Sequence, residues 1–250
     1  MGARKVTGDN QTLNIGVLGF GYWGPNQVRN FAALRSRGVE VRAVADLDPV
    51  RRIQAADMFP EIATVERAES VIDDPEIDAV VIATPAHTHY ELGQAALLAG
   101  KHILVEKPVT TKLADAQRLT SLASELGLTL MVGHTYEYAP AVDYLHDLLN
   151  SGDIGDTLYM RSQRVNLGQH QKHINVLWDL APHDISVFTY LLGAMPTHVS
   201  AIGRAHVTPG IPDIVSLTLE YDNNVMANVI LSWLDPRKVR DLTIIGTRKM

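Results

Sequence analysis

Two groups of side chains in this chain have the types and spacing that acid–base chemistry requires. The first is Lys107, which follows the apolar run HILVE and is expected just past the carboxyl end of a buried strand, where open α/β sheets place ligands. An ammonium group beside a substrate hydroxyl would stabilise a developing alkoxide or relay its proton during hydride transfer. The next residue, Pro108, fixes the backbone and could form a cis peptide. Alternatively, Glu106 to Pro108 form only a solvated strand end.

The second group lies in residues 179–192, DLAPHDISVFTYLL, which have helical spacing. A carboxylate at Asp179 could orient and charge-stabilise the imidazole of His183 four residues later, and an ordinary imidazole pKa of about 6.5 suits proton transfer near neutral pH. Pro182 would be tolerated in a first turn, and Gly193 would end the helix. A surface pair is the alternative interpretation. We expect Ala181, Ile185, Phe188 and Leu192 on the packed face, and Asp179, His183, Ser186 and Tyr190 on the opposite face.

A glycine motif near the amino end predicts a dinucleotide site. Residues 14–24, NIGVLGFGYWG, form a short apolar run that breaks into three spaced glycines. Gly19 permits a tight strand-to-helix turn, Gly21 lets the backbone approach a pyrophosphate, and Gly24 allows close helix–strand packing. The following helix would offer free N–H groups and its positive dipole end to the phosphates. Asp46, which ends the next apolar run, is spaced to bind the adenosine ribose and repel a 2′-phosphate, which predicts NAD rather than NADP.

The segment TPAHTH follows another apolar run and opens a helix, so its backbone should border the cofactor. His87 and His89 suggest a metal site, but helix capping by Thr84 or Thr88 is the preferred interpretation. No metal-ligand spacing such as H-E-x-x-H occurs, so we predict no metal. The predicted cofactor-binding residues are Gly19, Phe20, Gly21, Tyr22, Trp23, Gly24, Asp46, Thr84, Pro85, His89, Glu106 and Lys107.

A polar run from Asn166 to Asn175 could line a polyol or phosphate site, or be an ordinary surface loop. Arg161, Arg164 and Lys172 could meet a diphosphate, or be simple surface charges. The polar run also contains Gln169, His170 and His173. The predicted substrate-binding residues are Lys107, Arg164, Asn166, Asp179 and His183.

The elements that must position these side chains alternate between strand and helix as far as about residue 132. Continuous apolar runs fit strands buried on both faces, and the alternation predicts a doubly wound parallel sheet, a Rossmann fold. The expected strands are 14–19, 40–46, 62–65, 78–84, 102–107 and 128–133, and the expected helices are 23–36, 49–57, 87–99 and 111–126.

After about residue 133 the pattern changes. Short connections such as residues 221–224, YDNN, join antiparallel strands, whereas parallel strands need long crossovers. We therefore expect an α+β domain on a largely antiparallel sheet, truncated because the chain ends directly after a strand. Helices are expected over 139–149 and near 179–192, and strands over 197–206, 213–221, 225–234 and 239–246. The predicted division is a flexible tail, 1–13, a dinucleotide-binding domain, 14–135, and a substrate or oligomerisation domain, 136–250.

Composition narrows the function classes. The chain has 250 residues, 46% hydrophobic and 20% charged, which is typical of a globular protein. A formal net charge of −6 gives nucleic acid little to bind. No stretch approaches the roughly 20 apolar residues of a membrane span, and the first residues lack a signal sequence, which predicts a cytoplasmic protein without membrane partners. The chain has no cysteine, so its chemistry must come from other side chains or a cofactor.

Taken together, GFGYWG, the acid that ends the second run, TPAHTH, AGKHILVEKP and DLAPHD resemble the Gfo/Idh/MocA family of NAD(P)-dependent sugar and cyclitol oxidoreductases. The resemblance covers about residues 14–246. It implies a Rossmann domain followed by an α+β domain whose open sheet face often forms dimers or tetramers. The family's E-K-P lysine and its D-x-x-x-H aspartate and histidine correspond to Lys107, Asp179 and His183, which implies His183 as the general base.

The chain departs from the family pattern in two places. Tyr138-Ala139-Pro140 stands where the family commonly has an Asn-Pro pair, so substrate contacts there do not carry over. Family members also usually continue for many tens of residues beyond the point where this chain ends.

The leading hypothesis is an NAD-dependent dehydrogenase that acts on a CH–OH group of a sugar, cyclitol or nucleotide sugar, assembled as a homodimer or homotetramer. In this hypothesis Lys107 polarises the reacting oxygen, His183 exchanges its proton and Asp179 positions His183. The alternatives are a non-catalytic NAD-sensing or regulatory protein on the same fold, and a fold fragment without present function.

Overall fold

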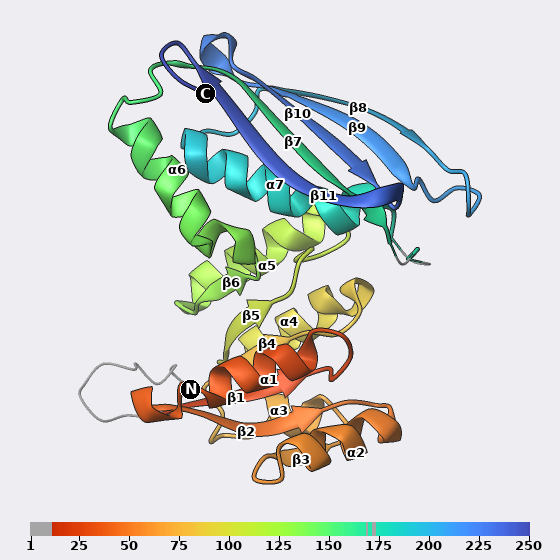
Figure 1. Ribbon diagram of the computed structural model, residues 1–250. Coiled ribbons are helices and arrows are strands. Elements are labelled where there is room, and N and C mark those ends of the chain that lie inside the picture. The colour runs from red at the N-terminus through yellow and green to blue at the C-terminus, as the bar shows by residue number, and fades with distance from the viewer. Residues whose placement is uncertain (1–11, 169, 172–173) are drawn as a thin grey trace. The chain divides into compact units, whose positions relative to one another are not determined.

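The computed structural model describes residues 12–168, 170–171 and 174–250 (Figure 1). The chain divides into two compact units at the peptide between Gly133 and His134. Each unit has its own sheet and its own hydrophobic core. Within the described ranges, no helix is both long and apolar enough to cross a membrane.

The first unit is built on a six-stranded sheet in the order β3-β2-β1-β4-β5-β6, and all of its strand pairs are parallel. The predicted doubly wound sheet is therefore confirmed, including the short strand expected near residues 62–65. The strand order reverses between β1 and β4, the type of position where open α/β sheets bind ligands. The strands are β1 (Leu13–Leu18), β2 (Val39–Ala45), β3 (Ala63–Val65), β4 (Ala79–Ile82), β5 (His102–Val105) and β6 (Leu130–Val132).

Alternation along these strands explains how the sheet is buried on both faces. Val80 and Ile82 of β4 belong to one core cluster, whereas Val81 between them belongs to the cluster on the other face. The unit's helices are α1 (Gly24–Ala32), α2 (Pro49–Met58), α3 (Glu69–Ile72), α4 (His89–Leu98) and α5 (Leu113–Leu126), with 3-10 turns η1 (Arg35–Arg37) and η2 (Ala86–Thr88). The first helix is shorter than the expected 23–36, because the chain tightens into η1 after Ala32.

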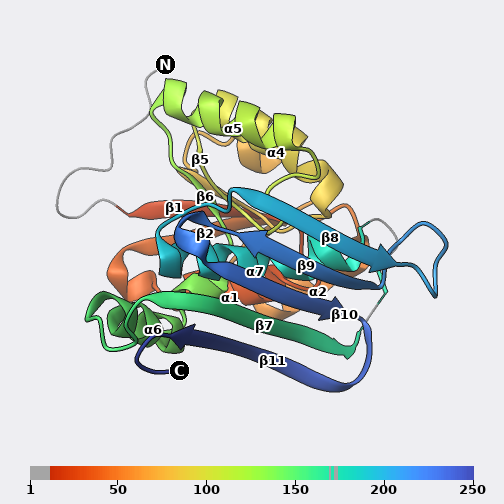
Figure 2. The same cartoon turned by 90° about the horizontal axis from the view of Figure 1, so that it is seen from above.

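The second unit is built on a five-stranded sheet in the order β11-β7-β10-β9-β8. Figure 2 looks onto the face of this sheet that lies away from α7. The sheet is largely antiparallel, as predicted, but β7 and β10 pair in parallel. The sequence interpretation had no strand at β7, which is the central partner of both β10 and β11. The strands are β7 (Thr157–Leu167), β8 (His198–Arg204), β9 (Ile214–Glu220), β10 (Met226–Ser232) and β11 (Leu234–Gly246).

The longest helix of this unit packs against β9 and β10. It begins after Asn175, whose side chain accepts a hydrogen bond from the amide of Trp178, and it ends at Gly193 with φ 62°. The helix starts three residues earlier than predicted, so Pro182 lies inside it rather than in its first turn. The helices are α6 (Pro140–Asn150) and α7 (Val176–Leu192), with 3-10 turns η3 (Thr135–Tyr138) and η4 (Asp222–Asn224).

Candidate functional site

The glycine turn after β1 has the shape of a dinucleotide cradle. Gly19 has φ 91°, and a Cβ there would lie 2.8 Å from the carbonyl oxygen of Ala83. A Cβ at Gly24 would overlap the carbonyl oxygen of Gly19, so both glycines are required by the fold itself. A Cβ at Gly21, in contrast, would meet only the guanidinium of Arg51, at 3.3 Å. Backbone at Gly21 is thus left open, as close approach of a pyrophosphate requires.

The start of α1 also suits a phosphate group. The helix begins at Gly24, and no side chain caps its first N–H groups. Uncapped N–H groups and the positive dipole end favour an anion at this position. These features fit the pyrophosphate of NAD, which is the cofactor that the sequence predicts.

Asp46 connects the glycine turn to the end of β2. Its carboxylate is 8% exposed, and Oδ2 accepts a hydrogen bond of 2.7 Å from the amide of Phe20. Oδ1 accepts a second bond of 2.9 Å from the amide of Asp48, and Arg51 Nη1 lies 3.7 Å from Oδ2. The carboxylate therefore holds the turn in place, and ribose binding by Asp46 stays a prediction.

The three aromatic residues of the turn, Phe20, Tyr22 and Trp23, differ in their surroundings. Phe20 is buried, and its ring meets Phe59 edge-on with 6.3 Å between centroids. Its side chain is thus part of the core, so cofactor contact at this position would come from its backbone. Tyr22 and Trp23 are 81% and 44% exposed, and their rings pack edge-to-face.

The loop after β4 is closed by hydrogen bonds that were not predicted. The hydroxyl oxygens of Thr84 and Thr88 lie 2.7 Å apart, and Thr88 donates to the carbonyl oxygen of Pro85. Neither threonine caps a helix with its side chain, so the capping interpretation was wrong. The hydroxyls instead stabilise the turn that leads from β4 into α4.

His89 joins this loop to the loop after β5. Its ring is 1% exposed; Nδ1 lies 2.9 Å from the carbonyl oxygen of Pro108, and Nε2 lies 2.8 Å from that of Thr84. Carbonyl oxygens only accept, and the tautomer of the ring decides which nitrogen donates. A ring nitrogen of His89 could bind NAD or a metal only by giving up its contact with one of these carbonyl oxygens. Across the described ranges, no three acidic or histidine side chains are grouped as a metal site would need.

The loop after β5 carries the predicted lysine. Glu106 is 8% exposed and accepts a hydrogen bond of 2.5 Å from Gln27 of α1, while Lys107 is half-buried. The peptide between Lys107 and Pro108 is cis. The predicted cofactor residues of this unit thus follow the carboxyl ends of β1, β2, β4 and β5, which parallel pairing brings to one edge of the sheet.

In the second unit, α7 is more buried than its sequence pattern indicates. His183 and Ser186 were expected on an open face, but each is 9% exposed, and Asp184 is 6% exposed. The expectation is wrong for these two residues, because α7 is covered on more than one side, whereas Tyr190 is 36% exposed as expected. The ring of His183 meets the ring of Tyr136 edge-on, with 4.8 Å between centroids.

Asp179 lies one helical turn before His183, as predicted. Its Oδ2 accepts a hydrogen bond of 3.2 Å from the indole Nε1 of Trp233, which is buried at the end of β10. The indole thus fixes one oxygen of the carboxylate. Orientation of His183 by Asp179 stays a prediction.

Arg164 is buried in an ion pair. Its guanidinium donates to Asp184 through Nε at 2.9 Å and Nη2 at 3.2 Å, and it lies 4.4 Å above the ring of Tyr136. Burial alone would lower the pKa of Arg164, but Asp184 outweighs burial and the pKa is raised. Arg164 therefore keeps its charge and shares it with Asp184; substrate contact by Arg164 stays a prediction.

The other predicted substrate residues are placed less centrally. Asn166 is half-buried near the carboxyl end of β7, and Arg161 is exposed, with a side chain that alternation directs to the other face of the sheet from Arg164. The ring of His170 meets Trp233 edge-on, with 5.6 Å between centroids. Gln169, Lys172 and His173 lie outside the described residues.

Sequence reasoning missed three residues around His183. Their partners lie far away in the sequence. Asp184 pairs with Arg164, 20 residues earlier, and Trp233 binds Asp179, 54 residues earlier. Tyr136 of η3 meets His183 of α7. The sequence offered one signal, the carboxylate of Asp184 next to His183. A carboxylate buried on an apolar helix needs a cation as its partner. No periodic pattern identifies which cation that is.

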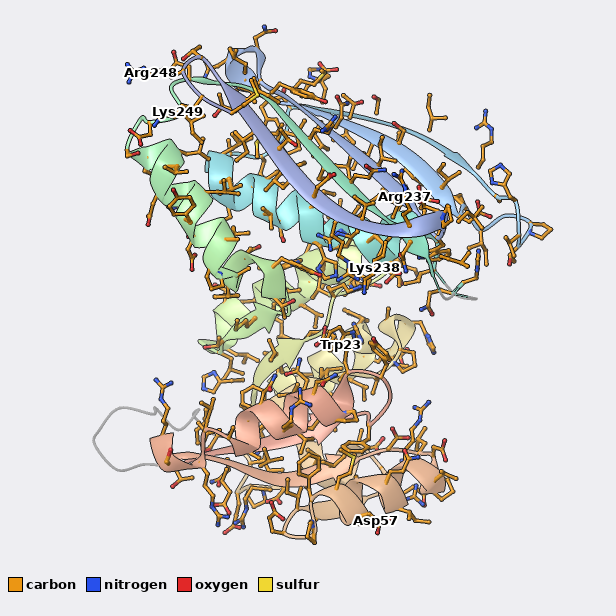
Figure 3. All side chains as sticks on the ribbon, in the orientation of Figure 1. Trp23, Asp57, Arg237, Lys238, Arg248 and Lys249 are labelled. Carbon is orange, nitrogen blue, oxygen red and sulfur yellow. The ribbon has the colours of Figure 1, made fainter. Side chains whose placement is uncertain are left out.

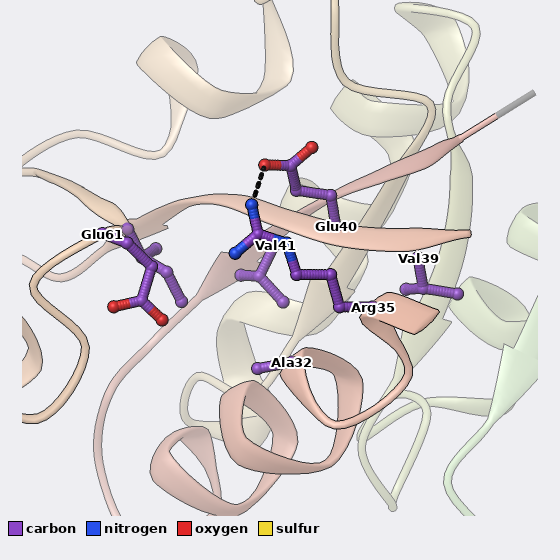
Figure 4. A pocket seen from close by; sticks show the side chains of 7 residues that line it. Ala32, Arg35, Val39, Glu40, Val41 and Glu61 are labelled. Atoms are coloured by element: carbon purple, nitrogen blue, oxygen red, sulfur yellow. Dashed lines mark ion pairs between the residues drawn. The ribbon is translucent and has the colours of Figure 1, made fainter. Parts of the chain in front are cut away.

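A small pocket lies elsewhere on the first unit (Figure 4). It is formed where α1 ends and β2 begins, which is the opposite end of α1 from the glycine turn. Arg35 and Glu40 form an ion pair of 3.8 Å at its edge. We assign it no part in the candidate site. Its lining residues are Ala32, Arg35, Val39, Glu40, Val41, Glu61 and Ile62.

Comparison with known protein families agrees with both units. Residues 13–134 match the model of an oxidoreductase family with an NAD-binding Rossmann fold, and residues 142–250 match the Gfo/Idh/MocA C-terminal domain. These two matches cover nearly all of the chain and define an NAD-binding oxidoreductase. The chain belongs to the Gfo/Idh/MocA family.

Similar proteins include named dehydrogenases. UDP-N-acetylglucosamine 3-dehydrogenase of Acidithiobacillus ferrooxidans is 31% identical over 88% of this chain and 67% of its own length. Inositol 2-dehydrogenase 2 of Saccharopolyspora erythraea is 32% identical over 87% of this chain and 66% of its own length. Other relatives are matched over between 58% and 72% of their length.

A solved structure shows the same fold. Scyllo-inositol dehydrogenase from Lactobacillus casei, with bound NAD(H) and scyllo-inositol, superimposes with a TM-score of 0.84 at 22% identity. The match covers 95% of this chain and 75% of that chain.

Proposed function

We propose that this chain is an NAD-dependent dehydrogenase that oxidises a secondary alcohol of a sugar, cyclitol or nucleotide sugar, or reduces the corresponding ketone. The observation that carries the proposal is the presence of both family domains, each with its motif residues on an ordered element. Lys107 follows β5, and Asp179 and His183 lie one turn apart on α7. The named relatives, which act on UDP-N-acetylglucosamine and inositol, support this substrate range.

The fit of the first unit to NAD supports the cofactor assignment. Gly19, Gly21 and Gly24 would hold the pyrophosphate against the start of α1, and Asp46 would bind the adenosine ribose. When bound, NAD supplies the hydride acceptor, or the hydride donor in the reverse direction.

The proposed chemistry of the chain's own residues is a proton transfer. Lys107 donates a hydrogen bond to the reacting oxygen and stabilises negative charge on it. His183 takes the hydroxyl proton on a ring nitrogen as the C–H bond breaks, and returns it when the ketone is reduced. Asp179, held by Trp233, orients the imidazole and stabilises it when protonated.

Matched variants test the proposal. Lys107→Ala and His183→Ala are each expected to lower turnover by about 100-fold or more, because general acid–base groups contribute about that much. Both variants should still bind NADH, because neither change touches the glycine turn or Asp46, although Lys107→Ala also removes one predicted cofactor contact. The controls are Lys112→Ala and His198→Ala, whose side chains are exposed.

The measurements are absorbance at the nicotinamide band during a screen of sugars, cyclitols and nucleotide sugars, and fluorescence titration with NADH and NADPH. A non-catalytic sensor would bind NADH but turn over none of these substrates, and a fold fragment would not bind NADH. Full activity in both active-site variants would refute the assigned roles. Assembly as a homodimer or homotetramer and a cytoplasmic location are further parts of the proposal, to be tested by light scattering and by fractionation.

A further inference from the structure

Arg240 of β11 lies beside Arg164 in the second sheet. The two residues are register partners on the paired strands β11 and β7, and partners of this kind have side chains on the same face. On β7 that face also carries Met160 and Ser162, which are buried toward the core. Arg240 is therefore on the same side of the sheet as α7.

Tyr136 joins Arg240 to the proposed general base. Its hydroxyl oxygen accepts a hydrogen bond of 2.8 Å from Nη1 of Arg240, while the guanidinium of Arg164 lies over its ring. The same ring packs against His183 in a T-shaped arrangement, with 4.8 Å between centroids. One tyrosine side chain thus separates the Arg240 guanidinium from the His183 imidazole.

The charges of the two arginines are balanced differently. Arg164 is buried and neutralised by Asp184 through two hydrogen bonds. Arg240 is exposed, and its partner is the hydroxyl group of Tyr136; within the described chain no carboxylate forms an ion pair with it. Arg240 therefore carries an uncompensated positive charge next to the proposed site of proton transfer.

The chain around Arg240 adds to this positive charge. From Leu234 to Val239 the strand β11 advances by five residues, while its partner β7 advances by only two, from Leu167 to Val165. The extra residues of β11 therefore bulge out of the regular pairing. The bulge exposes Arg237 and Lys238, which are labelled in Figure 3. Asp235 lies 3.9 Å from Arg237 and offsets one of these charges.

We propose that Arg240, held by Tyr136, is a specificity-determining residue that binds an oxyanion of the substrate, a carboxylate or a phosphate. This inference rests on the proposed function and narrows it from any sugar or cyclitol to sugars with an anionic group. A guanidinium fits both anions because its planar N–H groups can donate to two oxygens at once. Arg161 and Arg164 are poorer choices, because the first faces away from α7 and the second is neutralised by Asp184.

The test compares anionic and neutral substrates in Arg240→Gln. Glutamine keeps a donor for Tyr136 but removes the charge. With NAD in excess, we expect KM for glucose 1-phosphate, glucuronate or UDP-N-acetylglucosamine to rise by about 10- to 100-fold, which is typical of losing a charge-assisted hydrogen bond. The KM for myo-inositol should change by less than twofold, and kcat should change little. Arg204→Gln, at an exposed arginine of β8, is the matched control.

Further arms identify the source of the oxyanion. Glucuronate and glucose 1-phosphate distinguish a carboxylate from a phosphate, and Tyr136→Phe should produce a smaller rise in the same KM values because it loses only the positioning hydrogen bond. Equal effects of Arg240→Gln on anionic and neutral substrates would overturn the proposal. So would a parent protein that uses myo-inositol but binds none of the anions.

A binding measurement separates this inference from the dehydrogenase proposal. Calorimetric titration of the NADH-loaded protein with UDP or glucose 1-phosphate requires no turnover. If the parent binds these anions and Arg240→Gln does not, the oxyanion site stands even when no sugar is oxidised. If the parent oxidises a neutral sugar and neither protein binds the anions, the dehydrogenase proposal stands and the oxyanion site fails.

Discussion

Replacing Gly21 by alanine should separate cofactor binding from folding. The new methyl group would meet only the guanidinium of Arg51, at 3.3 Å from Nη1 and 3.7 Å from Cζ, and that side chain is 46% exposed and free to shift slightly. Gly21 does not have a left-handed φ, so alanine is compatible with its backbone. Loss of chain entropy in the unfolded state would even favour folding by about 0.4–1 kcal/mol. We expect the free energy of unfolding to change by less than about 1 kcal/mol.

NADH binding by Gly21→Ala should weaken strongly. The methyl group would occupy the space through which a phosphate oxygen approaches the backbone. Losing one hydrogen bond to a charged group costs about 1.5–3 kcal/mol, which raises Kd by about 10- to 150-fold. Urea unfolding and fluorescence titration with NADH measure the two quantities on the same preparation.

Two other glycines provide the comparison. Gly19→Ala should lose both stability and binding, because φ 91° is unfavourable for alanine and its Cβ would lie 2.8–3.0 Å from backbone atoms of Ala83 and Thr84. Gly100→Ala should lose some stability through its φ of 80° but keep full affinity, since nothing lies within 4 Å of its Cβ. The reasoning is refuted if Gly21→Ala binds NADH like the parent, or if it unfolds as easily as Gly19→Ala.

Three further changes test buried polar groups. His89→Phe removes the ring nitrogens that contact the carbonyl oxygens of Pro108 and Thr84 and should cost about 1–3 kcal/mol in urea unfolding, the cost of one unsatisfied buried group; a loss well below 1 kcal/mol would contradict hydrogen bonding by His89. Asp184→Ala leaves the Arg164 charge buried and unpaired and should cost about 3–5 kcal/mol, whereas exchange of both residues for apolar ones should cost much less. Burial raises the pKa of Tyr221 to about 12 from 10.0, so the folded state holds a proton that the unfolded state loses; this contribution is complete below pH 10 and declines as the pH rises from 10 to 12. Tyr221→Phe should therefore reduce the loss of stability between pH 10 and 12, and identical pH dependence in both proteins would exclude Tyr221 as its source.

The local pattern of residues was sufficient for most of the first unit. Apolar runs identified the strands of the parallel sheet, and the glycine motif identified the turn into α1, because both depend on neighbours a few residues apart. In the second unit, Gly193 marked the end of α7 for the same reason. The strand β7 escaped prediction because two of its buried positions, Ser162 and Arg164, are polar, so it shows no alternating apolar pattern.

The contacts that shape the candidate site were decided only by the tertiary structure. Asp46 binds the amide of Phe20, His89 joins two loops, and Arg240 reaches Tyr136 across 104 residues of sequence. Each of these pairs depends on strand order and register, which bring distant segments together at fixed spacing. Residue types and short-range periodicity determine which elements form and what chemistry they offer. Long-range packing determines which charged group meets which partner. The reason is that an unpaired buried charge is costly, and only the folded sheets bring the two partners together.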